Sequence, residues 1–232
     1  SSLYSSFETS LLKFAILFFI ISIFFKLALA PFHLWAPDVY EGSLTSSTVF
    51  FAIMPKLGLF ILLIRIVYSA FFSFLEDLRH FIVFIAVISI LIGSIAGLEQ
   101  RKLKNLLAYS SISHMGYALL SFSTGTFEGL QLVFCYLIIY MYSGLGLWGI
   151  IVSMRLQRNY TQKQNTDITD FMLLGKSNKT IAFFFMVIIF SIAGIPPMIG
   201  FLVKLSVFLV SIEAFIYYAA FIAIIISVIS AF

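Results

Sequence analysis

The chain has 232 residues, of which 62% are hydrophobic and 10% are charged. A soluble domain carries about 25% charged residues, so this chain has too little polar surface to form a globule in water. Its net charge of +4 comes from fourteen Lys and Arg against ten acids, which indicates loop topology rather than binding to nucleic acid. The single cysteine, Cys135, excludes a disulfide framework, and its apolar neighbours predict a small buried residue.

Seven stretches are apolar and long enough to cross a bilayer, which needs about 20 residues of helix. The apolar runs are continuous rather than alternating, so they predict helices. In chain order the predicted spans are Leu11–Ala30, Thr45–Tyr68, Phe81–Leu98, Leu103–Phe122, Leu130–Met154, Thr180–Val210 and Phe215–Phe232. The predicted fold class is an all-α polytopic transmembrane helix bundle, with residues 1–232 as a single membrane domain.

Proline punctuates the first and the sixth predicted spans, at Pro31 and at Pro196-Pro197. Proline removes a backbone donor and clashes with the preceding turn, so carbonyls are freed that need other partners. Broken helices of this kind line cavities in transporters. The alternative is a kink that serves packing or, for Pro31, a simple helix end, and the sequence leaves both open.

Basic residues gather on one side of the predicted bundle when seven spans alternate in direction. The loops on that side are Pro31–Leu44, Glu99–Lys104 and Arg155–Lys179. Their basic residues are Arg101, Lys102, Lys104, Arg155, Arg158, Lys163, Lys176 and Lys179. Only Arg65 and Arg79 fall on the other side, so the basic side is predicted to face the matrix or cytoplasm. The polar stretch Leu156–Gly175 is predicted to be a solvated loop without chemistry.

Three lysines, Lys26, Lys56 and Lys204, lie inside predicted spans. A lysine near the bilayer centre costs about 2.5–3.5 kcal/mol even on the lenient insertion scale, so each position calls for a local reason. Buried lysines can gain and lose a proton, which makes proton or ion transport the first hypothesis. Lys56 lies near the middle of its span, beside Pro55, where a loosened helix could admit water.

The other two lysines lie near the punctuated segments. Lys204 follows Pro197 by about two turns and has the small residues Gly200 and Ser206 beside it, which permit close helix approach. Lys26 precedes Pro31 by about one turn. It either extends to the interface from a helix end or, if Pro31 marks a break, lies centrally in the membrane.

His114 is the remaining candidate for proton transfer. At helical spacing it shares a face with Ser110 and Tyr117. A histidine suits a proton relay because its ordinary pKa is about 6.5, although a membrane histidine can equally serve as a packing hydrogen-bonder. No acid lies in the apolar centre of any predicted span, so we expect the carboxylate partner of the lysines to lie outside this chain. The sequence contains no phosphate loop, HExxH or CxxC motif.

Three motifs carry a family resemblance. The run FFKLALAPFHLWAPDVYEGS, Phe24–Ser43, resembles the hallmark segment of NADH dehydrogenase subunit 2, an antiporter-like membrane subunit of respiratory complex I. The run KNLLAYSSISHMGY, Lys104–Tyr117, resembles the central motif of that family, and SIAGIPPMIGFLVKL, Ser191–Leu205, resembles its second broken helix. The resemblance implies an antiporter-like fold with two broken helices, and the combination points to subunit 2 within the wider group.

The resemblance also implies a role for each polar position. Lys26, Lys56, His114 and Lys204 match the groups that form a water-connected proton path across the membrane arm. The chain would then be a non-redox subunit of the proton-translocating NADH:ubiquinone reductase, with no cofactor of its own; NADH, FMN, iron–sulfur clusters and ubiquinone are expected in other subunits.

Expected partners are the other membrane subunits of complex I and lipids. They include a chain that supplies the amino-terminal helices, since the matched family begins well before its first broken helix. The expected location is the mitochondrial inner membrane, with a bacterial inner membrane as the other choice. Two alternatives stay open on sequence alone, namely a stand-alone cation/proton antiporter and a structural membrane scaffold without ion transport.

Overall fold

A computed structural model of the chain describes residues 2–157, 168–171 and 174–231, and its regular elements are helices. The long helices of the first part are α1 (Ser2–Leu27), α3 (Thr45–Ala70), α4 (Leu75–Leu98), α5 (Leu103–Phe122) and α6 (Phe127–Gln157). The last part contains α8 (Lys179–Ala193), α9 (Ile199–Glu213) and α10 (Tyr217–Ala231). Short connecting pieces are α2 (Trp35–Gly42), η1 (Phe72–Phe74), η2 (Ile168–Phe171) and α7 (Leu174–Ser177).

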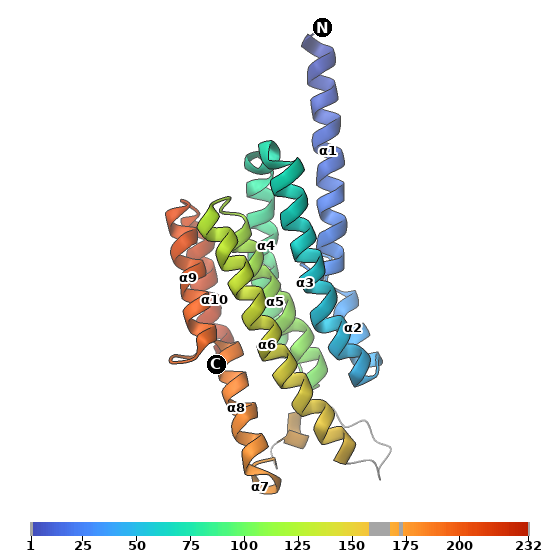
Figure 1. Cartoon of the computed structure of the whole chain (residues 1–232), viewed down its shortest axis with the longest axis vertical. Helices are drawn as coiled ribbons and strands as arrows, with labels where there is room; N and C mark the ends of the chain where they lie inside the picture. The colour runs from blue at the N-terminus through green and yellow to red at the C-terminus, as the bar shows by residue number, and fades with distance from the viewer. Residues whose placement is uncertain (1, 158–167, 172–173, 232) are drawn as a thin grey trace.

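The helices form one bundle in which α3, α4, α5 and α6 pack at the centre (Figure 1). Helix α1 lies on one flank, and α9 with α10 lies on the other. Backbone contact between α4 and α5 is very close, because a Cβ added at Gly93 would lie 2.6 Å from the Ser113 amide nitrogen. Helix α5 is buried along most of its length, as the central element of the bundle.

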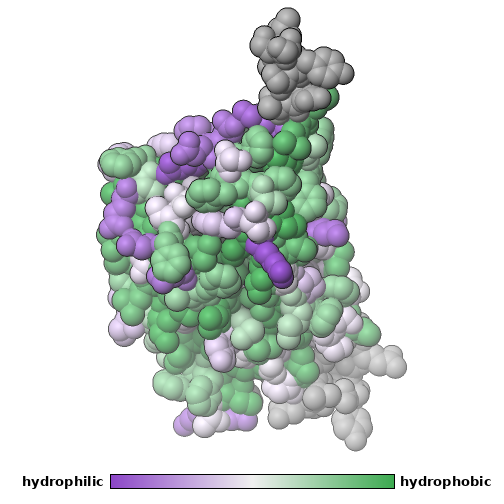
Figure 2. All heavy atoms as spheres, turned by 45° about the horizontal axis from the view of Figure 1, so that its top comes forward, coloured by the Kyte–Doolittle hydropathy of each residue, from purple (hydrophilic) through white to green (hydrophobic). Residues whose placement is uncertain are grey.

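The outer surface of the bundle is strongly apolar. Large aromatic side chains face outward along α1, with Phe18 68% exposed, and also on α10, at Phe221. Figure 2 shows hydrophobic residues over most of one face, with hydrophilic residues gathered mainly toward one rim. Three helical stretches are long and apolar enough to cross a membrane, namely Thr45–Ala70, Phe72–Leu98 and Phe127–Ser153, and α8 and α10 are shorter apolar helices. The chain is therefore a polytopic transmembrane helix bundle.

The predicted spans correspond to observed helices with shifted ends. Thr45 and Leu103 are the first residues of α3 and α5, as predicted, whereas α4 begins at Leu75 rather than Phe81. The predicted span began later because Glu76 and Asp77, in the first turn of α4, are too polar for an apolar stretch. Acidic residues are, however, favourable at a helix N-terminus. Cys135 was expected to be buried, but it is exposed on the outside of the bundle.

The connections that carry most of the basic residues lie at one end of the bundle (Figure 1). Lys102, between α4 and α5, forms an ion pair with Glu41 at the end of α2. The backbone amide of Ile168 donates to the Arg101 carbonyl oxygen at 3.2 Å, which joins η2 to the same end. This arrangement confirms the predicted alternation of the loops. The solvated loop predicted before Ile168, with Arg158 and Lys163, lies outside the described residues.

The first break separates α1 from α2. Helix α1 ends at Leu27, and Ala28 takes a left-handed conformation with φ of 59°, so that the Leu29 amide donates back to the Phe24 carbonyl. Two side chains bond backbone groups freed by the break. The Trp35 indole nitrogen donates to the Phe25 carbonyl at 2.9 Å, and the Ala30 amide donates to the Ser89 hydroxyl of α4 at 2.9 Å. Pro31 therefore marks a stabilised break rather than a helix end.

The second break separates α8 from α9 and uses the same type of C-terminal cap. Gly194 has φ of 83°, and the Ile195 amide donates to the Phe190 carbonyl. The helices then approach so closely that a Cβ at Gly200 would lie 1.8 Å from the Ser191 carbonyl oxygen. Predicted span Thr180–Val210 is thus two half-helices, and their junction reaches the polar interior of the bundle.

Candidate functional site

Helix α5 brings together three of the four predicted site residues. It carries His114, and it is contacted by Lys56 of α3 on one side and approached by Lys204 of α9 on the other. Both lysines are buried, with exposed fractions of 2% for Lys56 and 6% for Lys204. Neither lysine extends to the membrane surface, so each ammonium group must be stabilised inside the bundle.

The Lys56 ammonium group donates to the Ser111 hydroxyl of α5 at 2.6 Å. That hydroxyl in turn donates to the Ala108 carbonyl at 2.6 Å, which fixes its acceptor lone pairs toward the lysine. The Tyr40 ring of α2 lies 5.7 Å from the Lys56 nitrogen, a distance suited to a cation–π contact. Lys56 is therefore held by a hydroxyl and a ring, with no carboxylate within 4.0 Å among the described residues.

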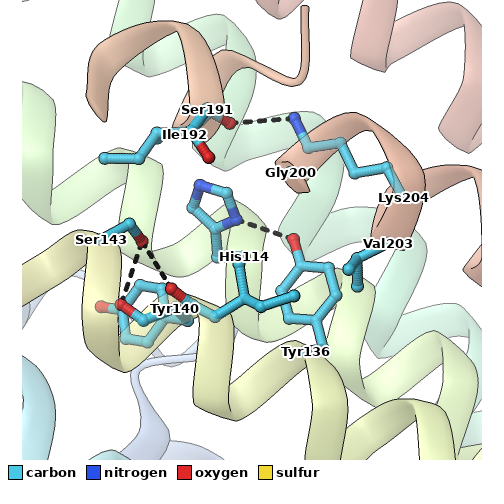
Figure 3. Close-up of a pocket in the computed structure, with 10 residues that line it drawn as sticks. His114, Tyr136, Tyr140, Ser143, Ser191, Ile192, Gly200, Val203 and Lys204 are labelled. Atoms are coloured by element: carbon cyan, nitrogen blue, oxygen red, sulfur yellow. Dashed lines mark hydrogen bonds between the residues drawn. The ribbon is translucent and has the colours of Figure 1, made fainter. Parts of the chain in front are cut away.

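The His114 ring lies between α6 and the break of the α8–α9 pair (Figure 3). Its Nδ1 shares a hydrogen bond of 2.7 Å with the Tyr136 hydroxyl, and its ring also packs at 5.7 Å from the Tyr140 ring. The Tyr140 hydroxyl donates to the Ala52 carbonyl at 3.2 Å, one turn before Lys56 on α3. Two tyrosines of α6 thus link the histidine to the helices that carry the lysines.

Lys204 caps the half-helix that the second break leaves open. Its ammonium group donates to the carbonyl oxygens of Ile192 at 3.2 Å and Ala193 at 2.8 Å, at the C-terminal end of α8. A cation at this end is favoured by the helix dipole. The Tyr117 ring of α5 lies 5.4 Å from the same nitrogen. The two carbonyl oxygens at the break and the Tyr117 ring thus stabilise the Lys204 ammonium group in place of a carboxylate.

Lys26 lies apart from the other three predicted residues. Its side chain is exposed on the outer face of α1, next to the exposed ring of Phe25. The structure therefore does not join Lys26 to the cluster of Lys56, His114 and Lys204 within this chain. Neither ion pair of the described residues involves Lys26, and a carboxylate partner outside this chain stays a prediction.

Sequence reasoning missed several groups of the site. Tyr136 and Tyr140 are four residues apart on α6 and face His114, a spacing that could have indicated them. Ser111 contacts Lys56, a role that the sequence did not indicate. Lys104 was assigned to a loop, but it lies in α5, is 1% exposed and donates to the Ser43 carbonyl at 2.6 Å.

The small residues beside Lys204 have different roles. Gly200 allows the close approach of the half-helices, as predicted. Ser206 is partly exposed, and its hydroxyl donates to the Leu202 carbonyl of its own helix. In the described part of the chain no group of three or more His, Cys, Asp or Glu residues could hold a metal ion. The site therefore consists of lysines, a histidine and hydroxyl groups, which can accept and donate protons.

A helix bundle with two broken helices and buried, partnered lysines is an arrangement typical of membrane transport proteins. Comparison with known proteins gives the family. The chain belongs to the NADH:quinone oxidoreductase/Mrp antiporter transmembrane family, whose profile matches residues 2–230.

Curated relatives carry one recurring name. The chain is 41% identical over 221 residues to NADH-quinone oxidoreductase subunit N 1 of Rhizobium meliloti, covering 95% of this chain and 45% of that protein. It is 39% identical over 219 residues to subunit N of Parvibaculum lavamentivorans, covering 94% of this chain and 44% of that protein. The chain thus spans about half the length of the curated relatives it matches.

Solved structures show the same fold. A chain of respiratory complex I from Thermus thermophilus with bound aureothin is similar with a TM-score of 0.76 and 28% identity, over 91% of this chain and 45% of that one. A chain of the Mrp complex from Dietzia is similar with a TM-score of 0.82 at 24% identity, over 91% of this chain and 38% of that one. The Mrp likeness establishes the shared fold and nothing more.

Proposed function

We propose that this chain is part of an antiporter-like membrane subunit of respiratory complex I, of the subunit N or subunit 2 type. In that role it contributes a segment of the proton path of NADH:quinone oxidoreductase. One observation carries the proposal: Lys56, His114 and Lys204 lie buried around α5, each with hydroxyl, ring or carbonyl partners. This arrangement suits proton transfer and holds no group that suggests redox chemistry in the described residues.

The proposed path runs laterally through the bundle. A proton held by Lys56 would pass by way of Ser111 and Tyr140 to His114, and from there by way of Tyr136 toward Lys204. Hydroxyl groups can accept one proton and donate another, so they suit the intermediate positions. Electron carriers are proposed for other subunits of the complex, and this chain would respond to them through charge changes in its neighbours.

A stand-alone cation/proton antiporter fits the site less well. A bound Na⁺ would need several oxygen ligands, and anionic ones help to stabilise it. Lysines hold the central positions instead, and neither ion pair of the described residues involves Lys56 or Lys204. Proton transfer is therefore the better proposal for this part of the chain, and pumping that required Na⁺ would contradict it.

We further propose that other complex I membrane subunits and lipids cover the apolar outer face of the bundle. Within that assembly, Lys26 pairs with an intramembrane carboxylate on a helix outside this chain. A photo-reactive residue at position 26 of the assembled complex should cross-link to a membrane segment that contains Asp or Glu. The same residue at Leu209, on the opposite flank, should not reach that segment. Cross-links from position 26 to lipid alone would contradict the pairing.

The proposed location is an energy-converting inner membrane. The high phenylalanine content, 28 of 232 residues, suits an AT-rich mitochondrial genome and favours the mitochondrial inner membrane. The named relatives are bacterial, so a bacterial inner membrane is the alternative. Residues 1–232 would form one membrane domain that is an incomplete antiporter-like unit.

Replacing His114 by Phe tests the proposed function. We expect proton transfer through this unit to fall by roughly 10²-fold, because the ring keeps its volume and loses both nitrogen atoms. The measurement is the number of protons translocated per NADH oxidised by the assembled complex in vesicles. His80→Phe is the matched control, since His80 is exposed at the far end of α4. Equal proton yields for both variants would contradict the proposal.

A further inference from the structure

Helix α2 is a short element that follows the first break and covers part of the proton site. It has eight residues, and a helix of that length is not stable in isolation. Its position in the bundle therefore depends on contacts with neighbouring helices. The contact that concerns the site is made by Tyr40, which is 1% exposed and whose ring centroid lies 5.7 Å from the Lys56 nitrogen.

The Tyr40 ring is not fixed in this position by its own hydroxyl group. That hydroxyl is buried and has no hydrogen-bond partner of normal geometry among the described residues. The ring packs edge-on against Trp148 of α6, with the ring centroids 6.3 Å apart. A cation–π contact needs the cation within about 6 Å of the ring centroid. The contact with Lys56 is close to that limit, so a small displacement of α2 would end it.

The end of α2 is attached to α5 by Glu41, the residue that follows Tyr40. One carboxylate oxygen of Glu41 forms an ion pair with Lys102, and the other accepts from the Asn105 side-chain amide at 2.8 Å. The carbonyl oxygen of the same Asn105 side chain is buried and has no hydrogen-bond partner among the described residues. The Asn105 side chain is thus oriented by the carboxylate alone.

A buried lysine completes the attachment. Lys104 is 1% exposed and donates to the carbonyl oxygen of Ser43, the residue just beyond α2, at 2.6 Å. The hydrogen bonds from Lys102 and Asn105, with the nearby charge of Lys104, hold the pKa of Glu41 below its usual range, so Glu41 is ionised at neutral pH. An exposed ion pair by itself contributes little to stability, but here several charged and polar groups form a network at one junction.

We propose that Glu41 is a positioning residue of the proton site, whose bonds to Lys102 and Asn105 hold α2 on α5 and so keep the Tyr40 ring over Lys56. The inference rests on the proposed function and adds to it a residue at the basic end of the bundle. Glu41 takes no proton in this role. It acts through Tyr40, which stabilises the Lys56 ammonium group where no carboxylate does so among the described residues.

Replacing Glu41 by Ala tests the inference, because it removes both bonds. We expect proton transfer through this unit of the assembled complex to fall by about tenfold or more, as for a misplaced group. Asp38→Ala is the matched control, since Asp38 is exposed on the same helix and neither ion pair of the described residues involves it. If Glu41→Ala prevents assembly, Glu41→Gln takes its place, because glutamine keeps the size and one acceptor oxygen.

Variants of Tyr40 distinguish positioning from a merely structural role. Tyr40→Phe keeps the ring and should transfer protons normally, whereas Tyr40→Leu should lose as much proton transfer as Glu41→Ala. In the double variant the two losses should not add, because Glu41 then has no ring to position. A merely structural Glu41 would instead lower proton transfer by the same factor with either residue at position 40. Proton yield per NADH is the measurement, with thermal unfolding of each complex as the check on stability.

Three results would overturn the inference. The first is a Glu41→Ala complex that transfers protons as well as Asp38→Ala, the second is fully additive losses in the double variant, and the third is a Tyr40→Phe complex as impaired as Tyr40→Leu. The outcome of His114→Phe separates these failures from failure of the proposed function. If His114→Phe loses proton transfer and Glu41→Ala does not, the positioning role falls alone; if neither variant has an effect, the proposed function falls as well.

Discussion

Replacing Lys56 by Met should abolish proton transfer through this unit, with a loss of at least about 10²-fold, while the assembled complex keeps its stability. Methionine has a similar length and is apolar, so it can fill the space between α3 and α5. The Ser111 hydroxyl retains its bond to the Ala108 carbonyl, so no buried donor is left without a partner. Proton yield per NADH and thermal unfolding of the complex are the two measurements.

The combination of the two results is informative because a structural lysine would behave differently. A buried ammonium group without a carboxylate costs about 2.5–3.5 kcal/mol, so its removal should leave stability equal or higher. Loss of function with gain of stability is typical of a residue kept for activity. A scaffold role predicts the reverse, namely lower stability and normal proton yield.

Lys13→Met is the matched control. Lys13 lies on α1 in an ion pair of 2.7 Å with Asp77, and both side chains are about half exposed. Exposed ion pairs contribute about 0–1 kcal/mol, so this variant should alter neither stability nor proton yield appreciably. A Lys13→Met complex that lost proton transfer as fully as Lys56→Met would show that the loss reflects charge in general rather than the buried site.

Replacing Gly200 by Ala should destabilise the second break and reduce proton transfer at the same time. The added Cβ would lie 1.8 Å from the Ser191 carbonyl oxygen, which belongs to backbone and cannot rotate away. The first turn of α9 must therefore move from α8, with an overpacking cost of about 1–3 kcal/mol. That movement would draw Lys204 from the Ile192 and Ala193 carbonyls.

Gly149→Ala provides the comparison for this variant. Gly149 lies within α6 and nothing lies within 4 Å of a Cβ added there, so the substitution should be neutral or stabilise the helix by up to about 1 kcal/mol. Thermal unfolding of the two assembled complexes measures the difference. Equal stability and equal proton yield would mean that the close contact at Gly200 has no part in holding the break.

Both breaks follow one physical plan, although their partners differ. A left-handed residue, Ala28 or Gly194, closes the first half-helix, and proline then prevents its continuation. At the first break neutral side chains, Trp35 and Ser89, bond the freed backbone groups. At the second break a charged lysine does so, which couples the backbone conformation there to the charge of Lys204. The second break also lies beside His114.

The sequence by itself determined the membrane class, the helical fold, the prolines that interrupt it and the identity of the charged residues. These follow from local features, because apolar runs of fixed length form helices in lipid, proline ends them, and an intramembrane lysine is costly wherever it lies. Only the tertiary structure decided which lysines lie buried around α5, near His114, and which lysine is exposed on the outside of the bundle. Those relations depend on helix rotation and on close approach at Gly93 and Gly200, which are set by packing between segments distant in the chain. For that reason Ser111 became recognisable as the partner of Lys56 only when α3 and α5 were placed side by side.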